Sequence, residues 1–413
     1  KQKTAYEIPK RDWSSDVCSS DLGTVYTATI TPTPNTVVSV SVAANAGQDA
    51  AGNGNSVSNT LSLTHDNIAP TVAITSNVSS PFNTASFTAT FTFSEAVTGF
   101  DVTDISVTNG AASAFSAVSG TVYTATITPT PNTVVSVSVA ANAGQDAAGN
   151  GNSVSNTLSL THDNIAPTVA ITGNVSSPFN AASFTATFTF SEGVTGFDAS
   201  DITVTNGTAS AFNATSSTVY TATITPTPNT VVSVSVAANR AQDAAGNGNS
   251  VSNTLSITHD NTPPTVAITS NVSSPFNAAS FTATFTFSEA VTGFALGDID
   301  VLNGAASSLS TTDNITYTAT ITPTPNTVVS VSVAANAAQD AAGNGNSVSN
   351  TLSLTHDNIA PTVAITSNVS SPFNTASFTA TFTFSEGVTG FNAADITVTN
   401  GTASAFNATS STV

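Results

Sequence analysis

A repeat of 97 residues is the feature that most constrains how this chain folds. Asp66, Asp163, Asp260 and Asp357 occupy the same place in near-identical copies, and each lies 97 residues after the one before it. Solenoid repeats are shorter and cannot bury a core singly, whereas a unit of this length can close its own hydrophobic core. We therefore expect separate domains in tandem.

The repeat divides most of the chain into three complete units, at roughly 69–165, 166–262 and 263–359. Residues 23–68 correspond to the C-terminal half of a unit, and residues 360–413 correspond to the N-terminal half of another. We therefore expect the chain to be a fragment of a longer protein, with any export signal or anchor lying outside it.

Residues 1–22 differ from everything that follows. They hold four of the five basic residues, the only Trp and the only Cys. They lack the apolar central run of a secretion signal. The strings KQKTAYEI and DWSSDVCSSDL look like translated adapter oligonucleotides of short-read DNA sequencing. We interpret this segment as a non-native leader and exclude it from fold reasoning, with a native basic leader as the alternative.

Each complete unit contains seven short segments in which apolar residues alternate with hydroxyl residues. This period of two is typical of half-buried β-strands, and no segment shows the apolar spacing of a helix. Seven strands in about 97 residues predict an all-β fold of tandem immunoglobulin-like sandwiches, arranged as beads on a string. In the first complete unit the expected strands are Thr71–Thr75, Phe87–Phe93, Ile105–Thr108, Ala111–Ser116, Thr121–Thr128, Thr133–Ala140 and Asn156–His162.

The charge balance restricts the partners of the chain. Residues 23–413 carry 20 acidic residues against one basic residue, Arg240. This excludes binding to nucleic-acid phosphates, which requires clustered Lys and Arg. It fits an extracellular surface or one whose charge is offset by bound cations. The repeats contain no Cys, so disulfides cannot stabilise them, and no apolar run approaches the length of a membrane helix.

Several motifs taken together resemble bacterial Ig-like repeats of large surface adhesins and other exported proteins. They are FTFSEAVTGF, D-I-x-V-x-NG, YTATITP, QDAAGN and HDNIAPTV, and they cover residues 23–413. The resemblance implies an extracellular sandwich that serves as a spacer or adhesive stalk, often stiffened by calcium between domains. The linker Asp66–Pro70 is also similar to the calcium-binding linker of cadherins, although the Asp-x-Asn pair that precedes that linker is absent.

Acidic residues at one end of each unit form a candidate calcium site. In up-and-down order, the loop after the second strand, the loop after the sixth strand and the incoming linker all lie at the same end. Calcium takes six to eight oxygen ligands, and clustered carboxylates repel one another without a cation. The candidate ligands are Asp66, Asn67, Glu95, Asp104 and Asp146; Asp163, Asn164, Glu192, Asp201 and Asp243; Asp260, Asn261, Glu289, Asp298 and Asp340; and Asp357, Asn358, Glu386 and Asp395.

Other interpretations of the same residues stay open. Asp-Asn and Asp-x-x-Gly-Asn favour turns without any metal. The single His of each unit, such as His162, is expected to be a solvated residue at a strand end. Two of the acidic residues could form a carboxylate pair like that of a glycosidase. The unit has few aromatic residues on which a sugar could stack, so we expect no enzyme activity. The alternative function is a multivalent module that contacts glycan, ice or a partner protein through loops or Thr-rich faces.

Overall fold

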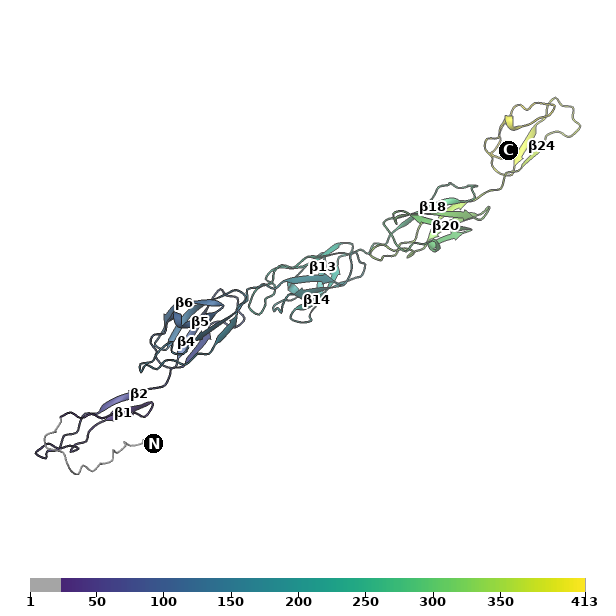
Figure 1. Cartoon of the computed structure of the whole chain (residues 1–413). Helices are drawn as coiled ribbons and strands as arrows, with labels where there is room; N and C mark the ends of the chain where they lie inside the picture. Colours follow the sequence, from purple (N-terminus) through teal and green to yellow (C-terminus); the bar gives the residue numbers. More distant parts are fainter. Residues whose placement is uncertain (1–23, 413) are drawn as a thin grey trace. The chain divides into compact units, whose positions relative to one another are not determined.

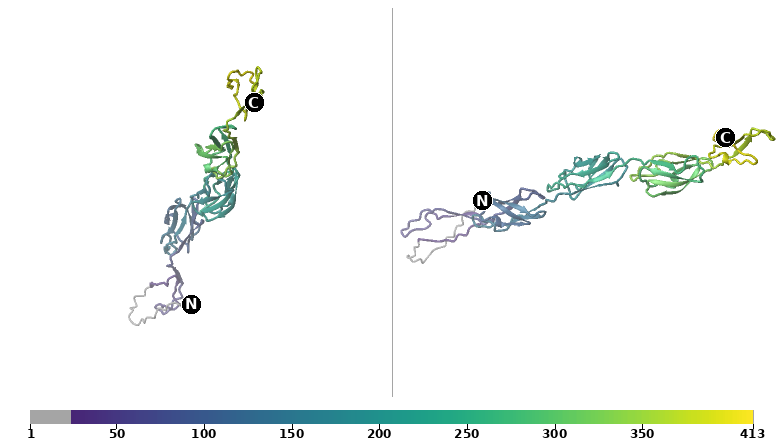
Figure 2. Two further views of the ribbon diagram at one scale, coloured as in Figure 1. Left: turned by 90° about the vertical axis from the view of Figure 1, so that its right-hand side faces the viewer. Right: turned by 90° about the horizontal axis from the view of Figure 1, so that it is seen from above.

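The computed structural model describes residues 24–412, so the leader interpretation for residues 1–22 lies outside the described residues. Two compact units are present, residues 24–165 with 244–247 and residues 166–243 with 248–412. The regular structure is β-strand with short 3-10 turns, and each complete repeat forms a two-layered body of its own (Figure 1; Figure 2). The predicted all-β class is therefore confirmed.

The first unit contains one paired segment followed by one complete repeat. The paired segment consists of β1 (Thr36–Val40) and β2 (Leu61–His65). The repeat contains β3 (Val72–Ser76), β4 (Phe87–Phe93), the 3-10 turn η1 (Val102–Asp104), β5 (Ile105–Thr108), β6 (Gly110–Ala117), β7 (Val122–Pro129), β8 (Val134–Val139) and β9 (Leu158–Thr161).

The second unit contains two further complete repeats and a partial one. The first has β10 (Val169–Gly173), β11 (Phe184–Phe190), η2 (Ala199–Asp201), β12 (Ile202–Thr205), β13 (Gly207–Ala214), β14 (Val219–Pro226), β15 (Val231–Val236) and β16 (Leu255–Thr258). The next has β17 (Val266–Ser270), β18 (Phe281–Phe287), η3 (Leu296–Asp298), β19 (Ile299–Leu302), β20 (Gly304–Thr311), β21 (Thr316–Pro323), β22 (Val328–Val333) and β23 (Leu352–Thr355). The partial repeat has β24 (Val363–Ser367), β25 (Ala380–Phe384) and η4 (Ala393–Asp395).

The strand order is that of an immunoglobulin constant-type sandwich. In the first repeat, one sheet has the order β3-β4-β7-β6 and the other has the order β5-β8-β9, with antiparallel neighbours throughout. These two orders correspond to the ABED and CFG sheets of that fold. The other two complete repeats have the same order. The seven predicted strands are all present, and their bounds shift by at most two residues at either end.

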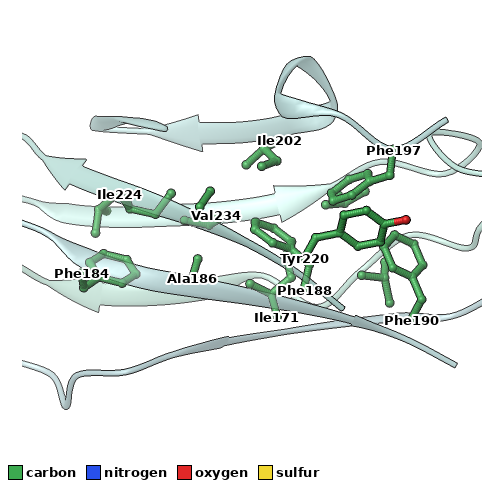
Figure 3. Packing of buried hydrophobic residues seen from close by; sticks show 14 of the residues in the cluster. Ile171, Phe184, Ala186, Phe188, Phe190, Phe197, Ile202, Tyr220, Ile224 and Val234 are labelled. Carbon is green, nitrogen blue, oxygen red and sulfur yellow. The ribbon is translucent and has the colours of Figure 1, made fainter. Parts of the chain in front are cut away.

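The inward-facing residues of both sheets form one core per repeat. In the first repeat Tyr123, Ala125 and Ile127 of β7 and Val135, Val137 and Val139 of β8 are buried, as their alternation predicts. In the second repeat Phe190, Phe197 and Tyr220 gather at one end of the core, with ring centroids 5.1 to 5.7 Å apart (Figure 3). Edge-to-face geometry of this kind adds to the burial of apolar area.

The single His of each complete repeat is buried, so the expectation of a solvated histidine was wrong for these three residues. His162 has an exposed fraction of 4%, and its ring lies 5.1 Å from the ring of Phe82. Phe82 reaches this position because its segment forms a parallel bridge with His162. This segment between β3 and β4 closes over the end of β9. The sequence does not predict this contact, because a single bridging residue forms no periodic pattern.

Candidate metal centre

Backbone hydrogen bonds bring three separate segments together at the entry end of the first repeat. The backbone N–H of Ser94 donates to the carbonyl oxygen of Thr71 at 2.9 Å, which ties the loop after β4 to the incoming chain. Thr98 and Gln145 exchange backbone hydrogen bonds at 2.8 and 2.9 Å, which ties that loop to the loop after β8. The buried hydroxyl of Tyr123 donates to the carbonyl oxygen of Val97 at 2.8 Å and fixes the first loop on the core.

One carboxylate from each segment meets at this end. Asp66, Glu95 and Asp146 each place an oxygen within 4.8 Å of the others. The third repeat has the same arrangement, with Asp260, Glu289 and Asp340. We call each such trio an acidic triad. The two loops and the linker therefore converge as the strand order predicts.

The deepest member of each triad is held by its own loop. Asp146 is buried, and its Oδ1 accepts the backbone N–H of Ala148 at 2.9 Å and of Asn150 at 2.8 Å. Its Oδ2 accepts the side-chain amide of Asn150 at 2.8 Å. In the third repeat Asp340 accepts the equivalent bonds from Asn344, both at 2.8 Å. Hydrogen bonds from this many donors favour the ionised form of Asp146.

The electrostatics of the triad differ between its members. Burial, followed by the charges of Asp66 and Asp146, raises the pKa of Glu95 above its ordinary value. Burial, followed by the charges of Asp340 and Asp260, does the same to the pKa of Glu289. In contrast, the side-chain amide of Asn150 lowers the pKa of Asp146. The glutamate is therefore the member whose ionised form is least well compensated by the protein.

Asp104 is not a member of the triad, and its role as a calcium ligand stays a prediction. Its Oδ2 accepts the backbone N–H of Asp101 at 2.9 Å, within a capping box around η1. Asp201, Asp298 and Asp395 have the same role at η2, η3 and η4, where they accept from residues 198, 295 and 392. These aspartates lie at the far end of the loop, because the 3-10 turn carries the chain across to the second sheet.

The backbone N–H group of each linker asparagine makes a hydrogen bond to an asparagine side chain. The N–H of Asn67 donates to the side-chain oxygen of Asn35 at 2.9 Å, and Asn164 donates to Asn132 at 3.0 Å. Asn261 and Asn358 donate to Asn229 and Asn326 in the same way. All four are exposed, and each is tied to the strand pair that precedes it.

The remaining candidate residues fall outside the two triads described above. Asp163 and Asn164 belong to the first compact unit, whereas Glu192 and Asp243 belong to the second. Asp357 lies in the linker before the partial repeat and Glu386 lies within it, and the described residues of that repeat, up to 412, include no equivalent of Asp146.

Sequence reasoning missed the asparagine that organises each triad. Asn150 donates one amide hydrogen to Asp146 and another to the backbone carbonyl oxygen of Asp66, at 3.1 Å. Asn344 bonds to Asp260 in the same way at 2.9 Å. The Asp-x-x-x-Asn spacing within QDAAGN was visible in the sequence, but only the fold shows that the linker carbonyl lies opposite it.

The fold and the triads define a protein of tandem Ig-like sandwiches with an acidic end on each repeat. A family model described as "Bacterial Ig-like domain" matches residues 66–162, 163–259, 260–356 and 357–413. The chain therefore belongs to the bacterial Ig-like domain family, as the sequence motifs suggested. No curated protein matches the chain.

Several solved structures are similar to the chain at low sequence identity. The Escherichia coli adhesin FdeC has 14% identity and a TM-score of 0.34, over 70% of this chain and 96% of that one. InvD of Yersinia pseudotuberculosis has 13% identity and a TM-score of 0.31, over 69% and 97%. Invasin, a bacterial integrin-binding protein, has 16% identity and a TM-score of 0.30, over 73% of this chain and 62% of that one. The chain thus spans less than two thirds of the invasin structure.

Within residues 24–412, no helix combines the length and the apolar character that crossing a bilayer requires.

Proposed function

We propose that this chain is a non-enzymatic spacer from a bacterial cell-surface or secreted adhesin-like protein, stiffened by calcium at the entry end of its repeats. The observation that carries the proposal is the acidic triad. The oxygens of Asp66, Glu95 and Asp146 come from the linker and two different loops and lie within 4.8 Å of one another. A cation held there would join the incoming chain to the body of the repeat.

The residues present fit a calcium ion. Carboxylate oxygens are its preferred protein ligands, and backbone carbonyls and water complete its coordination. Burial, followed by the charges of Asp66 and Asp146, raises the pKa of Glu95, and a bound cation would offset both effects. Arg240 is the only Lys or Arg of residues 23–413, so cationic side chains supply almost none of the missing charge. Asp66, Glu95 and Asp146 would hold the ion, and the ion would supply the positive charge.

A spacer role fits the rest of the chain. Near-identical sandwiches with short linkers extend a polypeptide without adding a new site, and export through a signal outside this chain would place them beyond the cell. The partners would then be the neighbouring repeats, with a surface ligand bound by domains outside this chain. The net acidity argues against nucleic acid as a partner.

The calcium component can be tested on the full chain by thermal melting and small-angle scattering, first with calcium and then with chelator. Binding to the folded state alone raises the melting temperature in proportion to the logarithm of calcium concentration. We expect a higher melting temperature and a narrower distribution of particle dimensions with calcium. Magnesium at the same ionic strength is the control, because it needs a smaller and more regular site. An identical melt and scattering curve in calcium and chelator would contradict the proposal.

The alternative function is multivalent binding through the Thr-rich faces, and the strand register favours it. Thr90 lies opposite Thr75 on one side and Thr124 on the other, and Thr88 lies opposite Thr126. The outer face of this sheet therefore carries rows of hydroxyl groups that could contact a glycan, ice or a partner protein. Binding screens of the full chain against glycans and ice would test it. Substituting Thr90, Thr187 and Thr284, the equivalent threonines of the three complete repeats, by Val should abolish any binding found. If no binding is found, the spacer function stays the proposal.

A further inference from the structure

Each complete repeat contains two Asn-Gly dipeptides, and the structure places them in different surroundings. One lies in the turn between the third and fourth strands of the repeat, and its asparagines are Asn109, Asn206 and Asn303. The other lies in the loop after the sixth strand, and its asparagines are Asn150, Asn247 and Asn344. We call them the turn set and the triad set. Because the two sets share one dipeptide, a large difference in their chemistry must come from the fold.

Asn-Gly is the dipeptide in which asparagine most readily loses its amide. The backbone nitrogen of the glycine attacks the side-chain Cγ of the asparagine, a five-membered succinimide ring closes, and the side-chain nitrogen leaves as ammonia. Water then opens the ring at one of its two carbonyl groups, and the product is aspartate or isoaspartate. Asparagine is a thermally labile residue for this reason. Glycine favours ring closure because it has no side chain to crowd the attacking nitrogen.

The turn after β5 requires this labile dipeptide. Asn109 has a φ of 55°, in the left-handed region that asparagine adopts more readily than most residues. A Cβ on Gly110 would lie 2.7 Å from the carbonyl oxygen of Thr128, which is closer than a methyl carbon can approach an oxygen. The corresponding distances in the other complete repeats are 2.8 Å from Gly207 to Thr225 and 2.9 Å from Gly304 to Thr322. Glycine is therefore required after the asparagine.

The asparagines of the turn set are exposed, and their side chains bond at the surface. The Nδ2 of Asn109 donates to the carbonyl oxygen of Val134 at 2.8 Å. The equivalent bonds, both at 2.9 Å, run from Asn206 to Val231 and from Asn303 to Val328. All three asparagines are exposed to solvent, so water can replace this bond when the side chain turns toward the glycine.

The attacking nitrogen of the turn set lies outside the hydrogen bonds of the sheet. The N–H of Thr130 donates to the carbonyl oxygen of Asn109 at 2.8 Å, so these two residues form a hydrogen-bonded pair. Gly110 lies opposite Pro129, the next pair along the strands. Hydrogen-bonded and non-hydrogen-bonded pairs alternate in an antiparallel ladder. The N–H of Gly110 therefore points away from β7, toward the open side of the edge strand β6.

The asparagine of the triad set is fixed from both its side chain and its backbone. The Nδ2 of Asn150 donates to the Oδ2 of Asp146 at 2.8 Å and to the carbonyl oxygen of Asp66 at 3.1 Å. The backbone N–H of Asn150 donates to the Oδ1 of Asp146 at 2.8 Å, and its carbonyl oxygen accepts the N–H of Asp146 at 3.1 Å. Turning this side chain onto the nitrogen of Gly151 would break both bonds of the amide.

The third repeat holds its triad asparagine in the same way. Asn344 makes all four equivalent bonds, at 2.8 to 3.1 Å, to Asp340 and to the carbonyl oxygen of Asp260. It is also buried, with an exposed fraction of 8%. Water is therefore poorly placed to replace these bonds, and hydrogen bonds in such surroundings cost more to break than exposed ones.

We propose that Asn109, Asn206 and Asn303 are the sites at which this chain deamidates, and that the contacts of the acidic triads protect Asn150 and Asn344. The modification places a carboxylate opposite the carbonyl oxygen of Val134, so that an acceptor faces an acceptor. Isoaspartate also lengthens the backbone of the turn that joins β5 of one sheet to β6 of the other. Each event therefore adds a negative charge and loosens this turn. The inference depends neither on the proposed spacer function nor on bound calcium.

The test is incubation of the full chain in mildly alkaline buffer with chelator, followed by mass spectrometry of its peptides. Digestion with an acid protease that cleaves after Phe, Tyr and Leu keeps further deamidation slow. It also separates the two dipeptides of a repeat, since residues 101–115 contain the first and residues 124–158 contain the second. A parallel incubation in urea gives the rates of both sets without the fold.

In urea we expect similar rates for the two sets, because they share one dipeptide. In native buffer, relative to urea, the turn set should deamidate roughly tenfold or more faster than Asn150 and Asn344, which must break more hydrogen bonds before the ring closes. Equal relative rates in native buffer, or faster modification of Asn150 and Asn344, would overturn the proposal. A turn set that is modified in urea but stays intact in native buffer would overturn it as well.

The source of the protection is tested by Asp146→Asn with Asp340→Asn. The new amide cannot accept from the Nδ2 of Asn150 or Asn344 as the Oδ2 of the aspartate does. Deamidation of these two asparagines should accelerate in native buffer, whereas the rate of the turn set should stay as in wild type. An unchanged rate at Asn150 and Asn344 would contradict protection by the triad. Chelator is present throughout, so loss of a calcium ligand does not affect the comparison.

The consequence for stability is tested by replacing the turn set. Asn109→Asp, Asn206→Asp and Asn303→Asp give the aspartate product directly, and urea unfolding of this variant and of incubated wild type should shift to lower urea. The matched control carries Asn109→Gly, Asn206→Gly and Asn303→Gly, because glycine accepts φ of 55 to 58° and cannot deamidate. The control should unfold at the same urea concentration before and after incubation. A loss on incubation as large as that of wild type would show that the turn set is not its source.

Discussion

The side-chain amide of Asn150 donates to the backbone carbonyl oxygen of Asp66 at 3.1 Å. The same amide donates to the Oδ2 of Asp146 at 2.8 Å. Asn150 thus holds together two of the three segments that supply the acidic triad. A neutral side chain therefore positions the linker against the repeat. The negative charge of the three carboxylates is not balanced by this contact, and a cation could balance it.

A first prediction follows from these two hydrogen bonds of Asn150. Asn150→Asp together with Asn344→Asp removes the two donors and adds a fourth carboxylate to each triad. The melting temperature in chelator should fall, because like charges in contact repel one another. Calcium should recover more of the melting temperature than it adds in wild type. The control is Asn77→Asp with Asn271→Asp, which adds the same charges to side chains that only accept a backbone N–H, at 2.8 Å. An equal response in the two variants would contradict the prediction.

A second prediction concerns the glutamates. Glu95→Gln with Glu289→Gln removes the member of each triad whose pKa is raised by burial and by its acidic neighbours. In chelator at neutral pH, the melting temperature should rise, because a repelled charge is replaced by a neutral amide of the same shape. The increase caused by calcium should shrink, since a ligand is lost. Isothermal titration with calcium checks the second part, and undiminished affinity would show that the glutamates are not ligands.

The third prediction is the pH dependence of stability in chelator. Because the pKa of Glu95 and Glu289 is raised in the folded state, the folded protein takes up protons first as the pH falls. Wild type should therefore become more stable between pH 7 and about pH 5. The lowered pKa of Asp146 acts oppositely, because its contribution to stability is present above the unfolded pKa of about 4 and is lost as the pH falls below that value. The glutamine variant should lack the rise. Urea unfolding of wild type and of the glutamine variant across this pH range measures the free energy of unfolding of each.

A fourth prediction separates the capping aspartates from the triad. Asp104→Ala with Asp298→Ala removes the acceptors for the N–H groups of Asp101 and Ala295. Loss of a cap of this kind costs about 1 kcal/mol per repeat. Urea unfolding should show that loss, whereas the response of the melting temperature to calcium should be the same as in wild type. A reduced calcium response would indicate that these aspartates are calcium ligands.

A fifth prediction concerns the buried histidines. The Nδ1 of His162, His259 and His356 is buried and has no hydrogen-bond partner among the described residues. His162→Phe, His259→Phe and His356→Phe keep a ring against Phe82 and its counterparts but remove the unpartnered nitrogen. Replacing such a group by an apolar one of similar shape is neutral or stabilising, by about 1 kcal/mol per site. A clear loss of stability in urea would show that the imidazole has a partner, such as a bound water.

Much of the fold follows from the sequence because strands have a period of two. The alternation of Phe87, Ala89, Phe91 and Phe93 predicts both the strand and its buried face, and the structure confirms both. The odd number of strands also predicts which loops lie beside the linker, so Glu95 and Asp146 could be placed next to Asp66.

Features that no periodic sequence pattern predicts were decided by the tertiary structure. Asp104 and Glu95 lie in the same acidic loop, yet only Glu95 joins the triad, because the 3-10 turn before β5 uses the Asp104 carboxylate as a cap. The burial of His162 depends on Phe82, which is 80 residues away and forms a single bridge.

The sequence by itself determined the repeat, its all-β class and the location of the acid-rich end, since these depend on local alternation and on composition. Only the tertiary structure decided which carboxylates meet and how the ends of each repeat are joined. Asn156 bonds to Ile74 and Asn150 bonds to Asp66 across more than 80 residues of chain. Such contacts are fixed by the packing of two sheets, and a single asparagine leaves no pattern in the sequence from which they could be read.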